Sequence, residues 1–147
     1  MSNVDKHRAL HEAFNRRDWT AVVQDFAADV EYTDHPRRVM FKGPQELVDY
    51  LKADWVAPFS DSAITDVQYI DAGDHVVAHF TGTGINDGAF GPMPRTILPM
   101  CTPICEILRF NEAGQIISGA LYYDLVTILV QLGHMEAPPA TEQTRPA

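Results

Sequence analysis

Hydrophobic side chains recur at helical spacing along the first third of the chain. Leu10, Ala13 and Phe14 predict a helix over residues 4–17, and a second short helix follows directly. The segment VEYTDH then has the character of a brief strand. A third helix begins near Pro44, because proline suits the first turn of a helix. The N-terminal part is therefore mainly helical.

From residue 62 onward the apolar period changes from 3.6 to 2, which predicts strands. The strand-like runs lie near residues 64–70, 75–84, 97–110 and 115–124. The apolar segment LVTILVQLG then predicts a closing C-terminal helix. Helices first and an antiparallel meander afterwards predict an α+β domain, with the helices covering one face of a strongly curved sheet.

The size and composition of the chain fit one globular domain. We expect residues 1–136 to form it and the polar tail, residues 137–147, to be disordered. The net charge of -9 repels nucleic acid and anionic membrane surfaces, so neither is an expected partner. The N-terminus lacks the apolar core of a signal peptide, and we expect a cytoplasmic protein. Cys101 and Cys105 are too far apart along one strand to form a disulfide.

Asp34 is the first candidate for chemistry. It shares a strand face with Val30 and Tyr32, because side chains alternate along a strand. If Tyr32 faces the interior, the carboxylate faces it too. The alternative is a turn, in which Asp34 binds backbone N–H groups just before Pro36. The sequence leaves both interpretations open.

Glu106 is the second candidate. It shares its parity with Met100, Ile104 and Leu108, so one register places a carboxyl group in an apolar row. Burial there raises a carboxyl pKa, and we expect Glu106 to be protonated. In the opposite register Cys105 faces inward and Glu106 lies in water, and the sequence leaves this open as well.

Other polar residues carry weaker signals. Asp124 precedes the last helix, where an aspartate caps the first N–H groups. His7 and His11 are four residues apart on a helix, but no third ligand lies at useful spacing, so we expect a solvated face and no metal. His79 lies in mid-strand and is either a pocket histidine or a core one. His35 is adjacent to Asp34 and can modify the pKa of that carboxyl.

The arrangement resembles a known family. The segments that carry the resemblance are NRRDW, FAADVEYTDHP, KGPQELVDYL, ILRFNEAGQI and YYDLVTILVQLG. Over residues 5 to about 134 they are similar to the SnoaL-like and ketosteroid isomerase-like families, within the nuclear transport factor 2-like superfamily. The resemblance implies a cone-shaped α+β fold whose curved sheet surrounds a deep apolar pocket.

The resemblance also implies roles for individual residues. Asp34 matches the general base of the ketosteroid isomerases, and Glu106 matches the acid that holds the enolate oxygen. Their tyrosine oxyanion donor falls at Leu10, and the catalytic aspartate of the SnoaL-like cyclases falls at Leu121. These two departures argue against both activities as those families perform them.

The resemblance and the pattern together give two leading functional hypotheses, beside a third in which the convex face of the sheet serves an accessory or interaction domain. The first is a small cofactor-independent isomerase, cyclase or lyase that moves a proton alpha to a carbonyl of an apolar, polyketide-, terpenoid- or steroid-like substrate, with Asp34 and Glu106 as catalytic residues. The alternative is a binding protein of the same fold for an apolar small molecule. The expected pocket residues are Tyr32, His35, Trp55, His79, Leu121 and Tyr123. Apolar residues on both faces of strand 97–110 predict a homodimer through the outer face of the sheet.

Overall fold

The computed structural model describes residues 1–139. Helix α1 (Asn3–Arg16) begins at Ser2, whose hydroxyl caps the backbone N–H of Asp5 while the Asp5 carboxylate accepts the N–H of Ser2. It ends at Arg17, which has a left-handed backbone conformation. The remaining helices are α2 (Trp19–Val22), α3 (Gly43–Leu51), which continues into the π-helical turn η1 (Lys52–Val56), and α4 (Leu125–Gln131).

Six strands form one mixed sheet in the order β2-β1-β6-β5-β4-β3. They are β1 (Phe26–Asp34), β2 (Val39–Lys42), β3 (Ala63–Ala72), β4 (His75–Ile85), β5 (Pro99–Phe110) and β6 (Ile116–Tyr123). The pair β1 and β6 is parallel, and every other neighbouring pair is antiparallel. The predicted α+β class with a curved sheet is confirmed.

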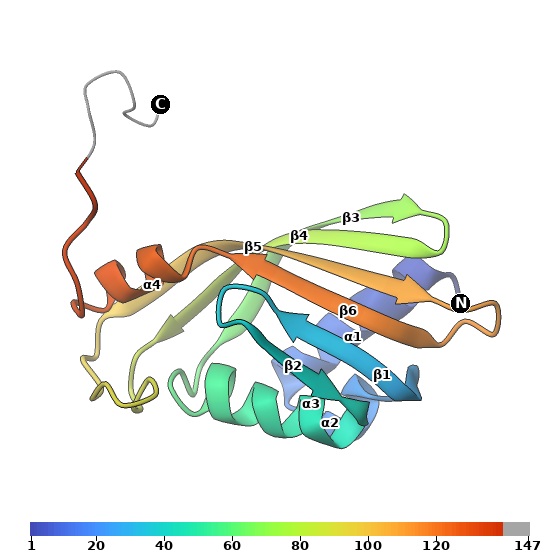
Figure 1. Cartoon of the computed structure of the whole chain (residues 1–147), viewed down its shortest axis with the longest axis horizontal. Helices are drawn as coiled ribbons and strands as arrows, with labels where there is room; N and C mark the ends of the chain where they lie inside the picture. Colours follow the sequence, from blue (N-terminus) through green and yellow to red (C-terminus); the bar gives the residue numbers. More distant parts are fainter. Residues whose placement is uncertain (140–147) are drawn as a thin grey trace.

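The helices and the sheet enclose one hydrophobic core. Helix α1 packs on β3 and β4, and α3 packs on β1, so both lie on the same side of the sheet (Figure 1). Helix α4 lies at the opposite end of β6 from the β5–β6 hairpin and is capped by Asp124, whose carboxylate accepts the N–H of Thr127 at 3.0 Å. The predicted cap is confirmed.

The register of β5 determines which way the carboxyl group of Glu106 points. Alternate residues of this strand are buried, namely Met100, Thr102, Ile104, Glu106, Leu108 and Phe110. Opposite them on β6, Gly119 leaves room for an aromatic ring, since a Cβ there would lie 2.3 Å from Cδ2 of Tyr32. Glu106 therefore faces the core, and Cys101 faces outward.

The structure adds details that the sequence pattern did not predict. Strand β2 follows the turn after Asp34 and pairs with β1, although residues 39–42 carry no alternating pattern. Strand β5 begins at Pro99 instead of residue 97, because Ile97 has a left-handed backbone with φ of 60°. Residues 137–139 are exposed, and the rest of the predicted tail lies outside the described residues. Within residues 1–139, no helix has the length and apolar character needed to cross a membrane.

Candidate functional site

A cavity lies between the inner face of the sheet and helices α1 and α3. Most of its wall is apolar, and five aromatic side chains contribute to it: Phe14, Phe26, Tyr32, Trp55 and Phe80. Three ionisable side chains reach the wall, namely His11, Tyr32 and Glu106. Such a cavity suits an apolar molecule that carries one polar group.

Glu106 is the centre of a buried hydrogen-bond cluster. The Nε2 atoms of His7 and His11 each lie 2.8 Å from its Oε1 atom. The hydroxyl of Tyr32 donates to its Oε2 atom. His11 also contacts the hydroxyl of Tyr69 through Nδ1, at 2.9 Å. Three donors from α1 and β1 thus converge on one carboxylate of β5.

This cluster determines the charge of Glu106. Burial by itself would raise its pKa, but the hydrogen bonds from His11 and His7 outweigh burial and hold the pKa of this carboxyl well below its usual range. Burial also raises the pKa of Tyr32 well above its ordinary value, so Tyr32 stays a neutral phenol and donor. The expectation of a protonated Glu106 is therefore wrong. Burial of Glu106 was one of the two registers that the sequence left open, and the strand pattern gave no sign of the donors.

The structure also contradicts the expectation that the two histidines of α1 form a solvated face. His7 and His11 are buried, with 0% and 2% of their surface exposed, and do not form a solvated face. Together with Leu10 and Phe14 they form one stripe at spacings of three and four residues. All four side chains therefore lie on the side of α1 that faces the core. Burial lowers the pKa of His7, so this imidazole is neutral at neutral pH.

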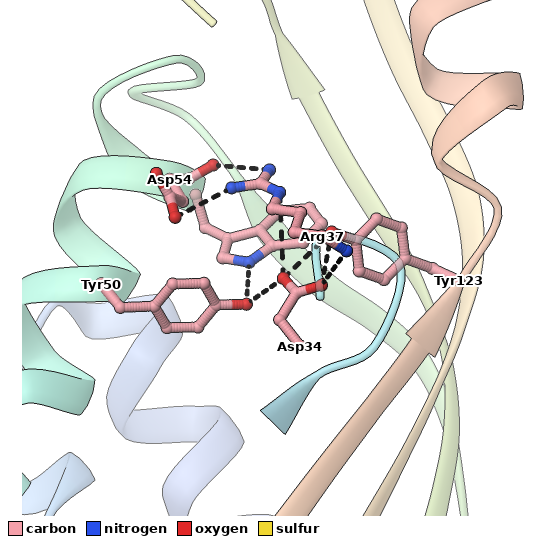
Figure 2. A network of polar contacts seen from close by, with 6 residues as sticks. Asp34, Arg37, Tyr50, Asp54 and Tyr123 are labelled. Atoms are coloured by element: carbon pink, nitrogen blue, oxygen red, sulfur yellow. Dashed lines mark hydrogen bonds and ion pairs between the residues drawn. The ribbon is translucent and has the colours of Figure 1, made fainter. Parts of the chain in front are cut away.

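Asp34 belongs to a second, separate network, shown in Figure 2. Its carboxylate accepts hydrogen bonds from the hydroxyls of Tyr50 and Tyr123 and from the backbone N–H of Arg37. The Arg37 guanidinium lies 3.8 Å from Asp34 and pairs with Asp54 at 3.1 Å. Asp34 is fully buried, so both sequence interpretations hold in part: it faces inward, and it also holds the turn after β1.

Asp34 is not among the residues that line the cavity. Its link to the cavity wall runs through Tyr50, whose hydroxyl accepts the indole N–H of Trp55 at 2.8 Å. Trp55 itself lines the cavity, and its ring also faces the guanidinium of Arg37, 4.9 Å from the ring centroid. The two carboxylates expected in one pocket are thus held in two different environments.

Some of the other expected pocket residues lie on the inner side of the sheet, and others are exposed on its outer side. Tyr32, Trp55 and Leu121 line the cavity, and Tyr123 points to Asp34. His79 is exposed, because its neighbours Ala78 and Phe80 occupy the buried parity of β4. His35 is also exposed and stacks on Tyr122 at 4.5 Å. His35 and His79 are therefore not pocket residues.

Comparison with known proteins identifies the family. The model of the SnoaL-like domain matches residues 7–119, which is most of the chain. The chain belongs to the SnoaL-like domain family. Among curated proteins, no sequence matches it significantly.

Solved structures with the same fold agree with this SnoaL-like assignment. A protein of Catenulispora acidiphila with a ketosteroid isomerase-like fold, solved in complex with trimethylamine, is 26% identical with a TM-score of 0.75, over 92% of this chain and 98% of that one. A proposed SnoaL-like polyketide cyclase of Jannaschia sp. CCS1 is 20% identical with a TM-score of 0.77, over 93% of both chains. AclR of Streptomyces galilaeus, a proposed hydroxylase, is 19% identical with a TM-score of 0.78, over 93% of this chain and 84% of that one. These likenesses show the shared fold.

Within this SnoaL-like domain, sequence reasoning missed His7, His11 and Tyr50. The two histidines had a usable signal, since they lie on the same helical stripe as Leu10 and Phe14. Tyr50 had none, because a tyrosine in an amphipathic helix is an ordinary core residue. Only the contact between α3 and β1 brings its hydroxyl to Asp34.

Proposed function

We propose that this SnoaL-like domain is a small isomerase- or cyclase-type enzyme that moves a proton alpha to the carbonyl of an apolar substrate. The substrate would occupy the cavity, and Glu106 would act at its wall. The observation that carries the proposal is a buried carboxylate, ionised by three hydrogen-bond donors, on the wall of an otherwise apolar cavity.

The chemical step uses the cluster as one unit. Glu106 accepts the proton of a carbon next to the carbonyl, and the electron pair of the broken C–H bond moves to the carbonyl oxygen as an enolate. Glu106 holds this proton itself, while the Nε2–H group of His11 stays hydrogen-bonded to Oε1 and keeps the carboxyl group in place. Tyr32 stays a neutral phenol, and once Glu106 is protonated its hydroxyl can turn from Oε2 to the enolate oxygen as a hydrogen-bond donor. The proton then returns to another carbon.

In this proposal Asp34 is a weaker candidate than Glu106 for the general base. Both of its oxygens accept hydrogen bonds from the protein, and the residue does not line the cavity. The hydrogen bonds that connect Asp34 to the cavity wall run through Tyr50 to Trp55. Asp34 would help to set the shape of that wall.

A second candidate function is binding without turnover. It is favoured by the same contacts that stabilise the anion, since a carboxylate with a lowered pKa and several donors is a weak base. The apolar wall, including Leu10 and Leu121 where related enzymes carry catalytic groups, would then hold a ligand and supply no chemistry.

The deciding experiment measures the exchange of alpha protons in D₂O for a panel of apolar cyclic ketones, by NMR, with chelator-treated protein. We expect exchange above the buffer rate, and a loss of about 100-fold or more in Glu106→Gln. His79→Gln, an exposed site on β4, is the control and should match wild type.

Each other outcome has a clear meaning. If Asp34→Asn abolishes exchange and Glu106→Gln does not, the role of base belongs to Asp34, as the resemblance implied. If no ketone exchanges but Trp55 fluorescence is quenched to saturation, the domain is a binding protein and the catalytic proposal is wrong.

A further inference from the structure

Two histidines and one carboxylate form a group that the proton-transfer proposal does not fully explain. His7 and His11 lie one turn apart on α1, and Glu106 approaches them from β5. Their ligand-type atoms all lie within 4.8 Å of one another, and all three residues are buried. Helix α1 by itself offers only two ligands. The third, Glu106, is 95 residues away from His11 in sequence but adjacent to it in space.

The two nitrogen–oxygen distances are close to those around a bound ion. Each Nε2 atom is 2.8 Å from Oε1, a hydrogen-bond length. Nitrogen and oxygen ligands at about 2.1 Å from a transition metal lie roughly 3.0–3.4 Å apart for angles of 90–110°. Lengthening these two distances by a few tenths of an ångström brings them into this range, and all three ligand atoms already lie within 4.8 Å of one another.

The contacts around the cluster are those expected around metal ligands. The Nδ1 atom of His11 lies 2.9 Å from the hydroxyl of Tyr69, which fixes the orientation of the ring. The second oxygen of Glu106 accepts a hydrogen bond from Tyr32. The Nδ1 atom of His7 is buried without a hydrogen-bond partner among the described residues. His7 is thus the least supported of the three.

One side of the cluster is open to the cavity, because His11 and Glu106 line its wall. Two imidazoles and a carboxylate with an open fourth position are the ligand pattern of catalytic zinc and of related divalent ions. A water molecule or the polar group of a ligand would complete the coordination from the cavity side.

We propose that His7, His11 and Glu106 bind one divalent transition-metal ion, with Zn²⁺ as the first candidate, and leave a coordination position open to the cavity. Each imidazole binds through Nε2, so its proton moves to Nδ1. His11 then donates to Tyr69, whereas His7 gains no acceptor. The ion bonds to the carboxylate in place of the two Nε2–H groups.

The test is a metal titration of the full chain after chelator treatment. Zn²⁺ is followed by isothermal titration calorimetry, and Co²⁺ by its visible absorption, which is strong only at low coordination number. We expect one ion per chain at micromolar concentration or below. X-ray absorption of the zinc form should show two imidazole ligands and oxygen.

Variants test which side chains bind the ion. Glu106→Gln and His11→Gln should weaken binding by more than about 100-fold, and Tyr69→Phe by about 10- to 100-fold. His7→Gln should cost less than His11→Gln. His75→Gln is the matched control, because His75 is partly exposed at the start of β4 and pairs only with Asp74 at 2.7 Å. It should leave binding unchanged.

The proposal is overturned if wild type binds no stoichiometric ion, or if Glu106→Gln and His11→Gln bind as wild type does. Tyr69→Phe keeps the test valid should the buried variants fail to fold, since Tyr69 is only partly buried. The inference goes beyond proton transfer and does not depend on it. Metal binding is measured without substrate, and proton exchange without metal, so either can fail alone.

Discussion

Asp34 and Glu106 occupy the same row of the sheet and are separated by one residue, Leu121. Leu121 pairs with Asp34 across the parallel β1–β6 ladder and with Glu106 across the antiparallel β6–β5 ladder. Two strand spacings of about 4.8 Å place the two backbones roughly 10 Å apart. A leucine thus keeps the two carboxylates apart, and each has its own set of donors.

The first prediction concerns the acid stability of chelator-treated protein. Because the folded-state pKa of Glu106 lies below its unfolded value of about 4.3, its contribution to stability is fully present above that value. The contribution is lost as the pH falls toward the folded-state pKa. We expect Glu106→Gln to be less stable than wild type at pH 7 and to lose less stability on acidification. Urea unfolding between pH 7 and pH 3 measures both.

Glu12→Gln is the control for that series, since Glu12 is exposed on α1. It should follow the wild-type curve. A carboxyl resonance of Glu106 that titrates above 4.3 in the folded protein would contradict the prediction.

The second prediction tests the network of Asp34. Tyr50→Phe removes one donor to Asp34 and leaves the indole N–H of Trp55, 2.8 Å from the lost hydroxyl, without its acceptor. An unpaired buried group costs about 1–3 kcal/mol, so the free energy of unfolding should fall by that amount. Tyr122→Phe, at an exposed tyrosine on the outer face, should change it by less than about 0.5 kcal/mol. Equal stability of the two variants would show that the network contributes little.

The third prediction concerns the close approach of β6 to Tyr32. A methyl group at Gly119 would lie 2.3 Å from Cδ2 of Tyr32 and 3.1 Å from Cδ2 of Leu108. Gly119→Ala must therefore displace Tyr32 from Glu106, and we expect a loss of about 1–3 kcal/mol in urea unfolding. Ser118→Ala, opposite exposed Glu31 on the other face, is the matched control. The prediction is wrong if Gly119→Ala is as stable as this control.

The fourth prediction concerns self-association through the outer face of the sheet. Tyr122 on this face is 44% exposed, and a partner would cover its apolar ring. We expect sedimentation at twice the chain mass of 16.4 kDa, and Tyr122→Arg should shift the protein toward the monomer. Ile70→Arg, an exposed position on edge strand β3, should not. A monomer at micromolar concentration would contradict the homodimer.

The sequence determined the order and type of most elements, because the apolar period is a local property. The change from helical to strand spacing near residue 62 and the cap at Asp124 both follow from residues close in the chain. The resemblance placed the fold correctly as well. The sequence did not predict strand β2, because this strand is defined by its pairing with β1. Its own residues show no strand pattern.

Only the tertiary structure decided the chemistry of the candidate site. Both faces of β5 carry apolar residues, so its register, and with it the burial of Glu106, depends on pairing with β4 and β6. The charge of Glu106 depends on His7, His11 and Tyr32, which come from distant segments. A pKa follows from the balance of desolvation and donors in space, and both depend on tertiary contacts here. The sequence therefore identified the two carboxylates, and the fold decided what surrounds each.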